Sequence, residues 1–219
     1  MEYKVNARQL VAFEVKSWIG RHFKSTKPLN VNQKIKYLNL GCGENYQEGY
    51  INADFFCHYR FWKKNATKLE WQLDLRYPLD CNENYFDGVF TEHTLEHLYP
   101  NDAKNLLKEL YRVLKTGGRI RITVPDLEKY VSFYNNYNDF SKFEAFHSRY
   151  SSRCSAIRNM TQNYFHLSVW DFDELRELLT SIGFSDIQRK SFSKTDDLKL
   201  NLDSLEREWE TLYVEAIKG

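Results

Sequence analysis

Short apolar runs alternate with helical patterns along most of the 219-residue chain. Because strands that alternate with helices form parallel sheets, this order predicts an α/β fold with a mostly parallel sheet. The last two predicted strands have no helical pattern between them, which predicts that one edge is antiparallel. The seven predicted strands span residues 35–40, 50–54, 69–73, 86–90, 119–124, 187–192 and 211–217.

Apolar residues at helical spacing predict helices around this sheet. The pattern at residues 5–23 predicts an amphipathic helix that lies over the sheet or over the mouth of a ligand site. A second helix is predicted after Asn101 or Asp102, either of which can cap it, and it ends at Gly117-Gly118. A short aromatic helix is predicted at residues 55–64.

The carboxyl-terminal half carries two further helical patterns. Asp171 is predicted to cap a helix that stops at Gly183. Residues 126–170 are helical in pattern and rich in aromatic side chains, which predicts a helical cap inserted after the fifth strand. We therefore predict a single domain over residues 1–219, with an N-terminal helix within residues 1–24.

Composition adds limits to this fold prediction. The chain has 31 basic and 30 acidic residues, so its net charge of +1 gives no general attraction to nucleic acid. No apolar run approaches the about 20 residues that cross a bilayer. The N-terminus lacks the apolar core of a signal peptide, and the four scattered cysteines fit free thiols better than disulfides. These features predict a cytoplasmic protein without a membrane span.

The stretch from Tyr37 to Asp54 carries the clearest candidate chemistry. An apolar strand runs directly into Gly41-Cys42-Gly43, where the missing Cβ atoms let the chain turn tightly and a ligand approach the backbone. The next strand ends in Asp54. A glycine turn after one strand and an acid after the next is how doubly wound sheets hold a nucleoside.

The turn departs from the dinucleotide pattern. Tyr46 stands where a third glycine would be, and Glu44 follows the turn directly. A carboxylate disfavours a neighbouring pyrophosphate and favours a ligand with a positive part. The turn therefore favours S-adenosylmethionine, whose sulfonium and amino group carry positive charge.

Five motifs in this order resemble class I S-adenosylmethionine-dependent methyltransferases. The resemblance is greatest to the small methyltransferases of bacterial surface-polysaccharide gene clusters. It implies a Rossmann-like sheet with helices on both faces and S-adenosylmethionine as the cofactor. The motifs are LNLGCG (38–43), INADF (51–55), DLRYPL (74–79), FDGVFTEHTLEHL (86–98) and ELYRVLKTGGRIRITVPDL (109–127).

The resemblance also implies roles for the matching positions. Gly41, Cys42 and Gly43 would pass under the methionine and the ribose, and Asp54 would accept hydrogen bonds from the ribose hydroxyls. The remaining cofactor positions implied are Asp74 at the adenine amino group, Leu75 beside the adenine ring, and Thr91 and Glu92 at the methionyl end or the acceptor.

A methyl acceptor that reacts through oxygen must lose a proton, and histidine is the natural base near neutral pH. His93 follows the fourth strand, at the edge of the sheet where ligands bind, and is our first candidate. His166 is the second, and a packing role for either residue is the alternative. His97 is expected to be structural.

Residues 93–97 also read HxxEH, the inverted zinc-protease motif. The motif lies after a strand and not within a helical protease context, so we predict no protease and assign no metal. A cation held by His93, Glu96 and His97 stays an alternative. Zinc or manganese would suit these ligands better than magnesium, which prefers oxygen.

The predicted function is methyl transfer to a small molecule or a glycan, on oxygen. Arg149, Arg153 and Arg158 could hold an anionic group of the acceptor, or could simply form a solvated basic face. Residues 130–170 could act as a lid over the acceptor. An RNA methyltransferase, which the near-zero charge disfavours, and a non-catalytic cofactor-binding partner subunit are the alternatives.

Overall fold

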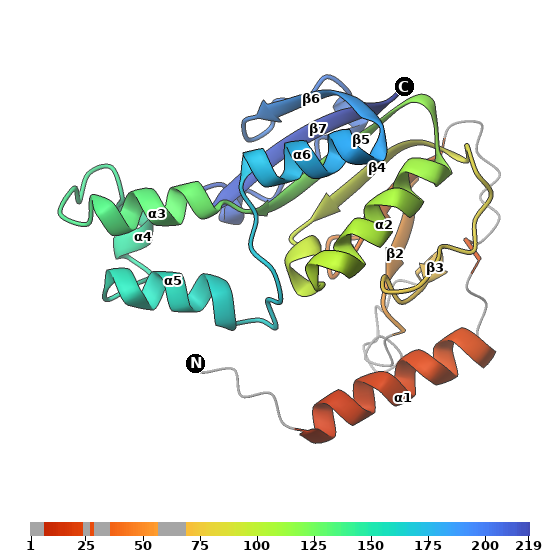
Figure 1. Cartoon of the computed structure of the whole chain (residues 1–219), viewed down its shortest axis with the longest axis horizontal. Coiled ribbons are helices and arrows are strands. Elements are labelled where there is room, and N and C mark those ends of the chain that lie inside the picture. The colour runs from red at the N-terminus through yellow and green to blue at the C-terminus, as the bar shows by residue number, and fades with distance from the viewer. Residues whose placement is uncertain (1–6, 24–26, 29–35, 57–68) are drawn as a thin grey trace.

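The computed structural model describes residues 7–23, 27–28, 36–56 and 69–219. Its centre is a seven-stranded sheet in the order β3-β2-β1-β4-β5-β7-β6 (Figure 1). β1 to β5 pair in parallel, whereas β7 runs antiparallel to both β5 and β6, which confirms the predicted antiparallel edge. The strands are β1 (Tyr37–Leu40), β2 (Ile51–Asp54), β3 (Trp71–Gln72), β4 (Phe86–Glu92), β5 (Leu114–Pro125), β6 (Phe184–Lys190) and β7 (Thr211–Lys218).

Helices α2 (Pro100–Val113) and α6 (Phe172–Ile182) cover one face of this sheet (Figure 1). Alternate apolar residues of the central strands point into this layer and are fully buried, because strand side chains alternate between faces. The predicted ends of α6 are confirmed: the Asp171 carboxylate accepts a hydrogen bond from the Glu174 backbone, and Gly183 ends the helix at a φ of 113°.

The segment 191–210 covers the opposite face of the sheet. It contains two short 3-10 turns, η3 (Leu198–Leu200) and η4 (Leu205–Arg207). The Tyr37 hydroxyl donates to Asp197 over 2.7 Å, and the Leu200 side chain is fully buried. An irregular segment therefore covers this face of the sheet, whereas helices cover the other face.

A buried ion network anchors this segment to the sheet. The Arg121 guanidinium on β5 donates to Asp203 over 2.8 Å and to Glu215 of β7 over 2.8 Å. All three side chains are fully buried. Arg121 also donates to the carbonyl oxygens of Ser191 and Lys194, so one side chain ties two strands to the covering segment.

The connection between β1 and β2 contains no helix. A loop of residues 41–50 joins these two parallel neighbours, although such crossovers usually take a dozen residues or more. The short aromatic helix predicted at residues 55–64 lies almost entirely outside the described residues.

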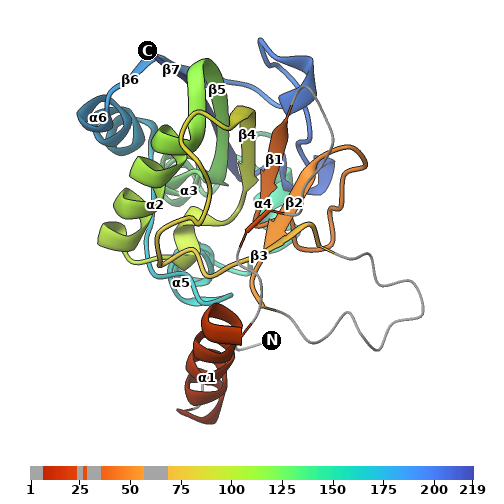
Figure 2. The same cartoon turned by 90° about the vertical axis from the view of Figure 1, so that its right-hand side faces the viewer.

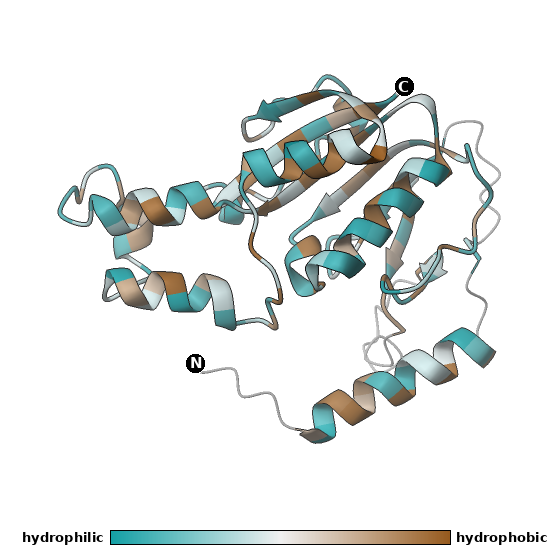
Figure 3. Cartoon of the chain, viewed as in Figure 1, coloured by the Kyte–Doolittle hydropathy of each residue, from teal (hydrophilic) through white to brown (hydrophobic). Residues whose placement is uncertain are grey.

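Helix α1 (Ala7–Phe23) forms as predicted but does not lie over the sheet, and its alternative placement over the mouth of a ligand site stays a prediction. It projects from the body of the molecule in both views (Figures 1 and 2), and only Ser17 and Gly20 are buried. A Cβ on Gly20 would lie 2.2 Å from the Phe56 ring, so the helix approaches the body most closely where a residue without a side chain makes room. Its large apolar side chains are exposed. Figure 3 shows the hydrophobic positions of the helix in brown.

Two predicted boundaries are also wrong. α2 begins at Pro100 after the N-cap Tyr99, since proline suits the first helical turn, and neither Asn101 nor Asp102 caps it. Strand β5 starts at Leu114 and runs through Gly117-Gly118, which the sequence had predicted as the end of the helix.

Three helices follow β5, as predicted for this aromatic stretch: α3 (Leu127–Asn135), α4 (Glu144–His147) and α5 (Arg153–Gln162). They extend beyond the carboxyl end of the sheet (Figure 1) and enclose a second apolar cluster. Ring contacts dominate this cluster, with Phe133 and Phe146 stacked at 4.9 Å. No described helix is long and apolar enough to cross a membrane.

The buried Arg121 network generates a stability prediction. Arg121→Ala should lower the free energy of unfolding by about 3–5 kcal/mol, because it leaves two buried carboxylates without their cation. Arg176→Ala is the matched control, since its ion pair with Asp173 is at least half exposed and should contribute less than about 1 kcal/mol. Urea unfolding followed by tryptophan fluorescence measures both. Equal stability of the two variants would contradict the assignment.

Candidate functional site

Two turns meet at the carboxyl ends of β1 and β4. Gly41 has a φ of 67° and Gly43 a φ of 51°, conformations that glycine adopts without strain. A Cβ on Gly41 would lie 2.2 Å from Oγ1 of Thr94, so the two turns are in direct contact. The position after β1 therefore requires glycine for its conformation and for the space that Thr94 takes.

Asp54 joins this pair of turns from the end of β2. One carboxylate oxygen accepts a hydrogen bond from the Gly43 backbone, and the other accepts one from Phe55, both over 2.6 Å. A Cβ on Gly43 would meet no atom within 4 Å, so open space lies beside this turn. The predicted pairing of the glycine turn with Asp54 is thus a contact in the structure.

Asp74 lies behind this turn and supports helix α1. It is 5% exposed, and its carboxylate accepts hydrogen bonds from the Ser17 hydroxyl and from the backbone and guanidinium of Arg76. Arg76 in turn binds Glu14 of α1. Burial acts against ionisation, but these hydrogen bonds outweigh it and hold the pKa of Asp74 below its ordinary value.

This arrangement bears on the adenine role implied for Asp74. A carboxylate offers about four acceptor positions, and these internal donors already use them. Binding an adenine amino group would require one contact of Ser17 or Arg76 to open. The role of Asp74, and that of the neighbouring Leu75, stay predictions.

The two residues at the end of β4 differ in their surroundings. Thr91 is buried, and its hydroxyl makes no hydrogen bond to any described residue. Glu92 is bound through both carboxylate oxygens to Ser204, whose backbone donates over 2.9 Å and whose hydroxyl donates as well. Their proposed place at the methionyl end of the cofactor stays a prediction.

His93 is held on both sides of its ring. Thr211 gives its hydroxyl hydrogen to the Arg207 carbonyl, so it accepts from Nε2 of His93 over 2.8 Å. Nδ1 lies 3.3 Å from a carboxylate oxygen of Glu96, and the His93 side chain is 5% exposed. The backbone at His93 has a φ of 47°, which is uncommon outside glycine. The surrounding contacts maintain this conformation.

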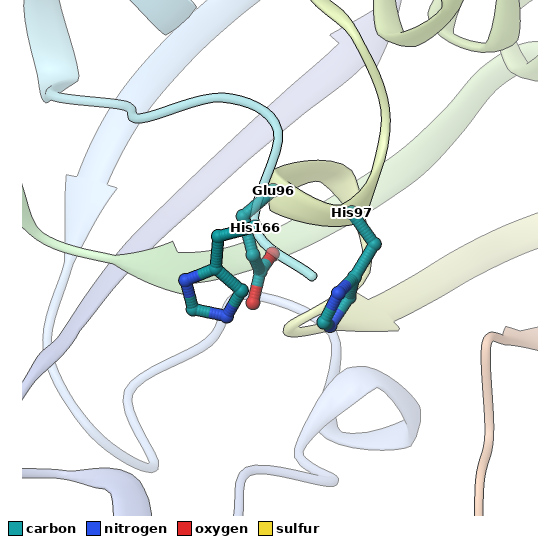
Figure 4. A group of neighbouring side chains, drawn as sticks. All are labelled: Glu96, His97 and His166. Atoms are coloured by element: carbon teal, nitrogen blue, oxygen red, sulfur yellow. The ribbon is translucent and has the colours of Figure 1, made fainter. Parts of the chain in front are cut away.

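The next turn carries a cluster of side chains that could bind a cation. Glu96 and His97 belong to the 3-10 turn η2 (Leu95–His97), and His166 comes from the segment between α5 and α6. One donor atom from each lies within 4.8 Å of the others. Figure 4 shows the Glu96 carboxylate between the two imidazole rings. His97, expected to be structural, is exposed.

Burial affects two groups of this cluster in opposite directions. Burial of the Glu96 carboxyl opposes its ionisation, but the neighbouring His93 outweighs burial and holds its pKa below the ordinary value. The 3.3 Å contact between Nδ1 of His93 and the Glu96 carboxylate lacks hydrogen-bond alignment, because Glu96 accepts no hydrogen bond through its carboxylate from the described residues. Burial lowers the pKa of His166.

A cleft of about 610 Å³ lies away from the glycine turn, between the start of β7, the end of β6 and helices α3 and α4. Its wall includes Thr211, the residue that His93 contacts, and the aromatic side chains Trp209 and Phe192. Of the three arginines considered from the sequence, Arg149 lines this cleft and lies over the Trp209 ring at 4.5 Å.

Comparison with known proteins supports the fold. Residues 38–122 match the family model described as a methyltransferase domain. An S-adenosylmethionine-dependent methyltransferase from Archaeoglobus fulgidus superposes with a TM-score of 0.52 at 18% identity, over 97% of this chain and all of that one. Residues 38–122 thus match a methyltransferase domain, and the chain as a whole has the fold of S-adenosylmethionine-dependent methyltransferases. The match begins within the strand that precedes the glycine turn.

Further solved structures share the methyltransferase fold. A possible histamine N-methyltransferase from Thermotoga maritima has a TM-score of 0.52 at 14% identity, over 95% of this chain and 89% of that one. The partner of the Trm112 activator in a Haloferax volcanii complex has a TM-score of 0.50 at 15% identity, over 97% and 94%. No curated protein matches the chain significantly.

The residues of the methyltransferase fit the cofactor. The open space beside Gly43 adjoins Asp54, whose carboxylate can accept hydrogen bonds from a ribose. Asp54 and the exposed Glu44 also place negative charge near the turn, which favours a cofactor with a sulfonium and an amino group. The observed geometry is therefore consistent with the implied cofactor residues Gly41, Cys42, Gly43 and Asp54.

The sequence analysis did not predict that His97 and His166 lie close together. The HxxEH spacing drew attention to His93, Glu96 and His97, but the structure pairs Glu96 and His97 with His166 and directs His93 to Thr211. His166 belongs to a distant segment without its own motif. Only the fold places it beside the turn.

We predict that Asp54→Asn weakens binding of S-adenosylhomocysteine about tenfold. The change removes the charge of an acceptor, and hydrogen bonds to charged groups contribute about 1.5–3 kcal/mol. Glu48→Gln, which neutralises an exposed carboxylate of the same loop, should bind as the wild type does. Calorimetric titration measures both affinities. Wild-type affinity of Asp54→Asn would remove Asp54 from the cofactor site.

Asp74 generates a prediction on pH dependence. Its folded pKa lies below the ordinary 3.8, so its stabilisation is present above 3.8 and is lost as pH falls through the lowered pKa. Asp74→Asn should therefore be about 1–3 kcal/mol less stable than wild type at pH 7, with the difference shrinking in acid. Asp173→Asn, at an exposed pair, should show little difference at either pH. A pH series of urea unfolding curves tests this; a constant difference would contradict it.

Proposed function

We propose that this methyltransferase modifies a hydroxyl oxygen of a small-molecule or glycan acceptor. The observation that carries the proposal is the cluster of Glu96, His97 and His166, one turn away from the contact between Thr94 and Gly41. The cofactor supplies an electrophilic methyl group, so the protein must align the acceptor and remove its proton. Oxygen acceptors need this proton removal, and a histidine cluster provides it.

The two predicted bases, His93 and His166, differ in which ring nitrogen carries a hydrogen and which keeps a lone pair. Nε2 of His93 carries the hydrogen that it donates to Thr211, and its Nδ1 faces Glu96. His166 instead donates from Nδ1 to the Met160 carbonyl over 2.5 Å, so Nε2 keeps its lone pair. This geometry supports His166 as the group that accepts the proton, with His93 as a positioning residue that holds Glu96.

The cleft beside Thr211 lies away from the glycine turn, so it supports the acceptor class only as a surface for a part of the acceptor remote from the reacting hydroxyl. Trp209 and Phe192 offer apolar surface, and Glu206, Glu208 and Lys129 offer polar groups, a combination that suits a sugar ring. Helices α3 and α4 contribute to its wall, as expected if the segment 126–170 selects the acceptor. A glycan acceptor is consistent with the resemblance to polysaccharide-cluster methyltransferases, and the predicted cytoplasmic location stays part of this proposal.

Transfer from S-adenosylmethionine with a ¹³C-labelled methyl group tests the proposal. The carbon chemical shift of the product differs between methyl groups on oxygen, nitrogen and carbon. Sugars, nucleotide sugars and phenols are offered as acceptors, with amines of similar size as the matched control. A methyl signal on nitrogen or carbon would contradict oxygen transfer, and turnover confined to RNA would contradict the acceptor class.

We predict that His166→Ala lowers kcat about 100-fold or more, the usual contribution of a general base. Affinity for S-adenosylhomocysteine should stay at the wild-type level, because His166 lies outside the glycine turn. His22→Ala, at an exposed position of α1, should retain both properties. Steady-state kinetics and calorimetry measure them. Wild-type turnover of His166→Ala would remove it as the base.

A further inference from the structure

We infer that Glu96, His97 and His166 form a binding site for a divalent cation of the zinc or manganese type. The three residues offer one carboxylate oxygen and two imidazole nitrogens within 4.8 Å of one another (Figure 4). Two ligands come from one turn, whereas the third comes from a segment far along the chain. A carboxylate with two imidazoles is a donor set that such cations favour.

The burial of Glu96 is the first observation that points to a cation. Its side chain is 1% exposed, and neither carboxylate oxygen accepts a hydrogen bond from the described part of the chain. A buried carboxylate without hydrogen bonds is costly, and proteins ordinarily satisfy such groups. The single close contact, Nδ1 of His93 at 3.3 Å, engages only one of the two oxygens. A cation between Glu96 and the two rings supplies the missing partner.

The orientation of His166 is the second observation. Its Nδ1 donates to the Met160 carbonyl over 2.5 Å, which fixes the ring and leaves the Nε2 lone pair available. Figure 4 shows one ring nitrogen of His166 directed to the Glu96 carboxylate. Metal-ligating histidines commonly donate their second ring nitrogen to a carbonyl in this way, because the contact sets the tautomer and the orientation.

The backbone around the cluster is held in place. Leu167 and Ser168 donate backbone hydrogen bonds to the Glu96 carbonyl over 2.7 and 3.2 Å. Tyr164 and Phe165, just before His166, have φ values of 57° and 62°, which are unfavourable for bulky residues. Strained conformations of this kind persist where the surrounding structure enforces them, and they are common at functional sites.

The distances allow coordination after a small rearrangement. Ligand atoms around a tetrahedral zinc ion at about 2.1 Å lie about 3.4 Å apart, so the atoms must approach by about 1.4 Å at most. His97 is exposed and can rotate to close this gap. Three protein ligands leave a coordination position open, as in zinc sites that act on substrates.

The role of this cation rests on the proposed function. Thr94, which precedes the η2 turn, contacts Gly41 of the cofactor turn, so the cation would lie beside the methyl donor. A cation there would lower the pKa of an acceptor hydroxyl bound at the open position, as it does for metal-bound water. With the cation bound, Nε2 of His166 would be a ligand instead of the base, and the acceptor proton would pass to solvent water.

Metal binding is tested without any acceptor. The full-length protein is treated with EDTA, dialysed and titrated with ZnCl₂ by calorimetry, with MnCl₂ and MgCl₂ in parallel. We expect one zinc per chain, weaker manganese binding, and no magnesium binding at matched concentration. His97→Ala and His166→Ala should each weaken zinc binding by about tenfold or more, as the loss of a ligand or of its support does. His22→Ala, an exposed histidine on α1, should bind as the wild type does.

A cobalt(II) titration adds a spectroscopic readout. The wild type should develop a visible absorption band, and His97→Ala, which changes an exposed side chain and should fold, should lose it. Substoichiometric zinc in the wild type, or unchanged zinc binding in His97→Ala, would overturn the site and would identify the two rings as a packed pair. The proposed function would survive such a result, because the labelled-methyl experiment judges it independently.

Discussion

The contact between Gly41 and Thr94 fixes the geometry of the whole site. It joins the turn that follows β1 to the turn that follows β4, and it leaves no space for a side chain at position 41. On one side of this contact lie Gly43 and Asp54, the residues proposed to bind the nucleoside part of the cofactor. On the other side lies the η2 turn with Glu96 and His97. The approach of the two turns therefore brings the proposed cofactor residues next to the residues proposed to prepare an acceptor.

Two buried charged side chains, Arg121 and Glu96, differ in how far the surrounding protein compensates their charge. Arg121 is surrounded by Asp203, Glu215 and carbonyl oxygens, so its charge is compensated within the protein. Glu96 is equally buried, but its compensation is incomplete. The first arrangement holds the covering segment to the sheet and leaves no capacity for a ligand. The second leaves the Glu96 carboxylate able to bind a further group beside the glycine turn. This difference distinguishes a candidate site from a structural ion network.

The sequence predicted the sheet, its antiparallel edge and the α6 helix because each depends on local patterns. Strand periodicity, the Asp171 cap and the Gly183 stop are all readable from neighbouring residues. Contacts between distant segments were harder to predict. Helix α1 has an apolar pattern, yet it approaches the body through Ser17 and Gly20, which no hydropathy pattern marks as an interface. His166 reaches Glu96 only because the chain returns there after three helices.

The order of the strands has a consequence for how the chain folds during synthesis. Among the strands that the structure describes, β6 pairs with β7 alone, and β7 is inserted between β6 and β5. Residues 184–190 therefore have no sheet partner until residues 211–218 have left the ribosome. Arg121 also lacks its full set of partners until then, because Asp203 and Glu215 both follow β6 in the sequence. Until then the nascent protein carries an unpaired β5 edge and an uncompensated Arg121. Formation of the eight-residue strand β7 therefore completes the sheet, the ion network and the wall of the cleft in one late step.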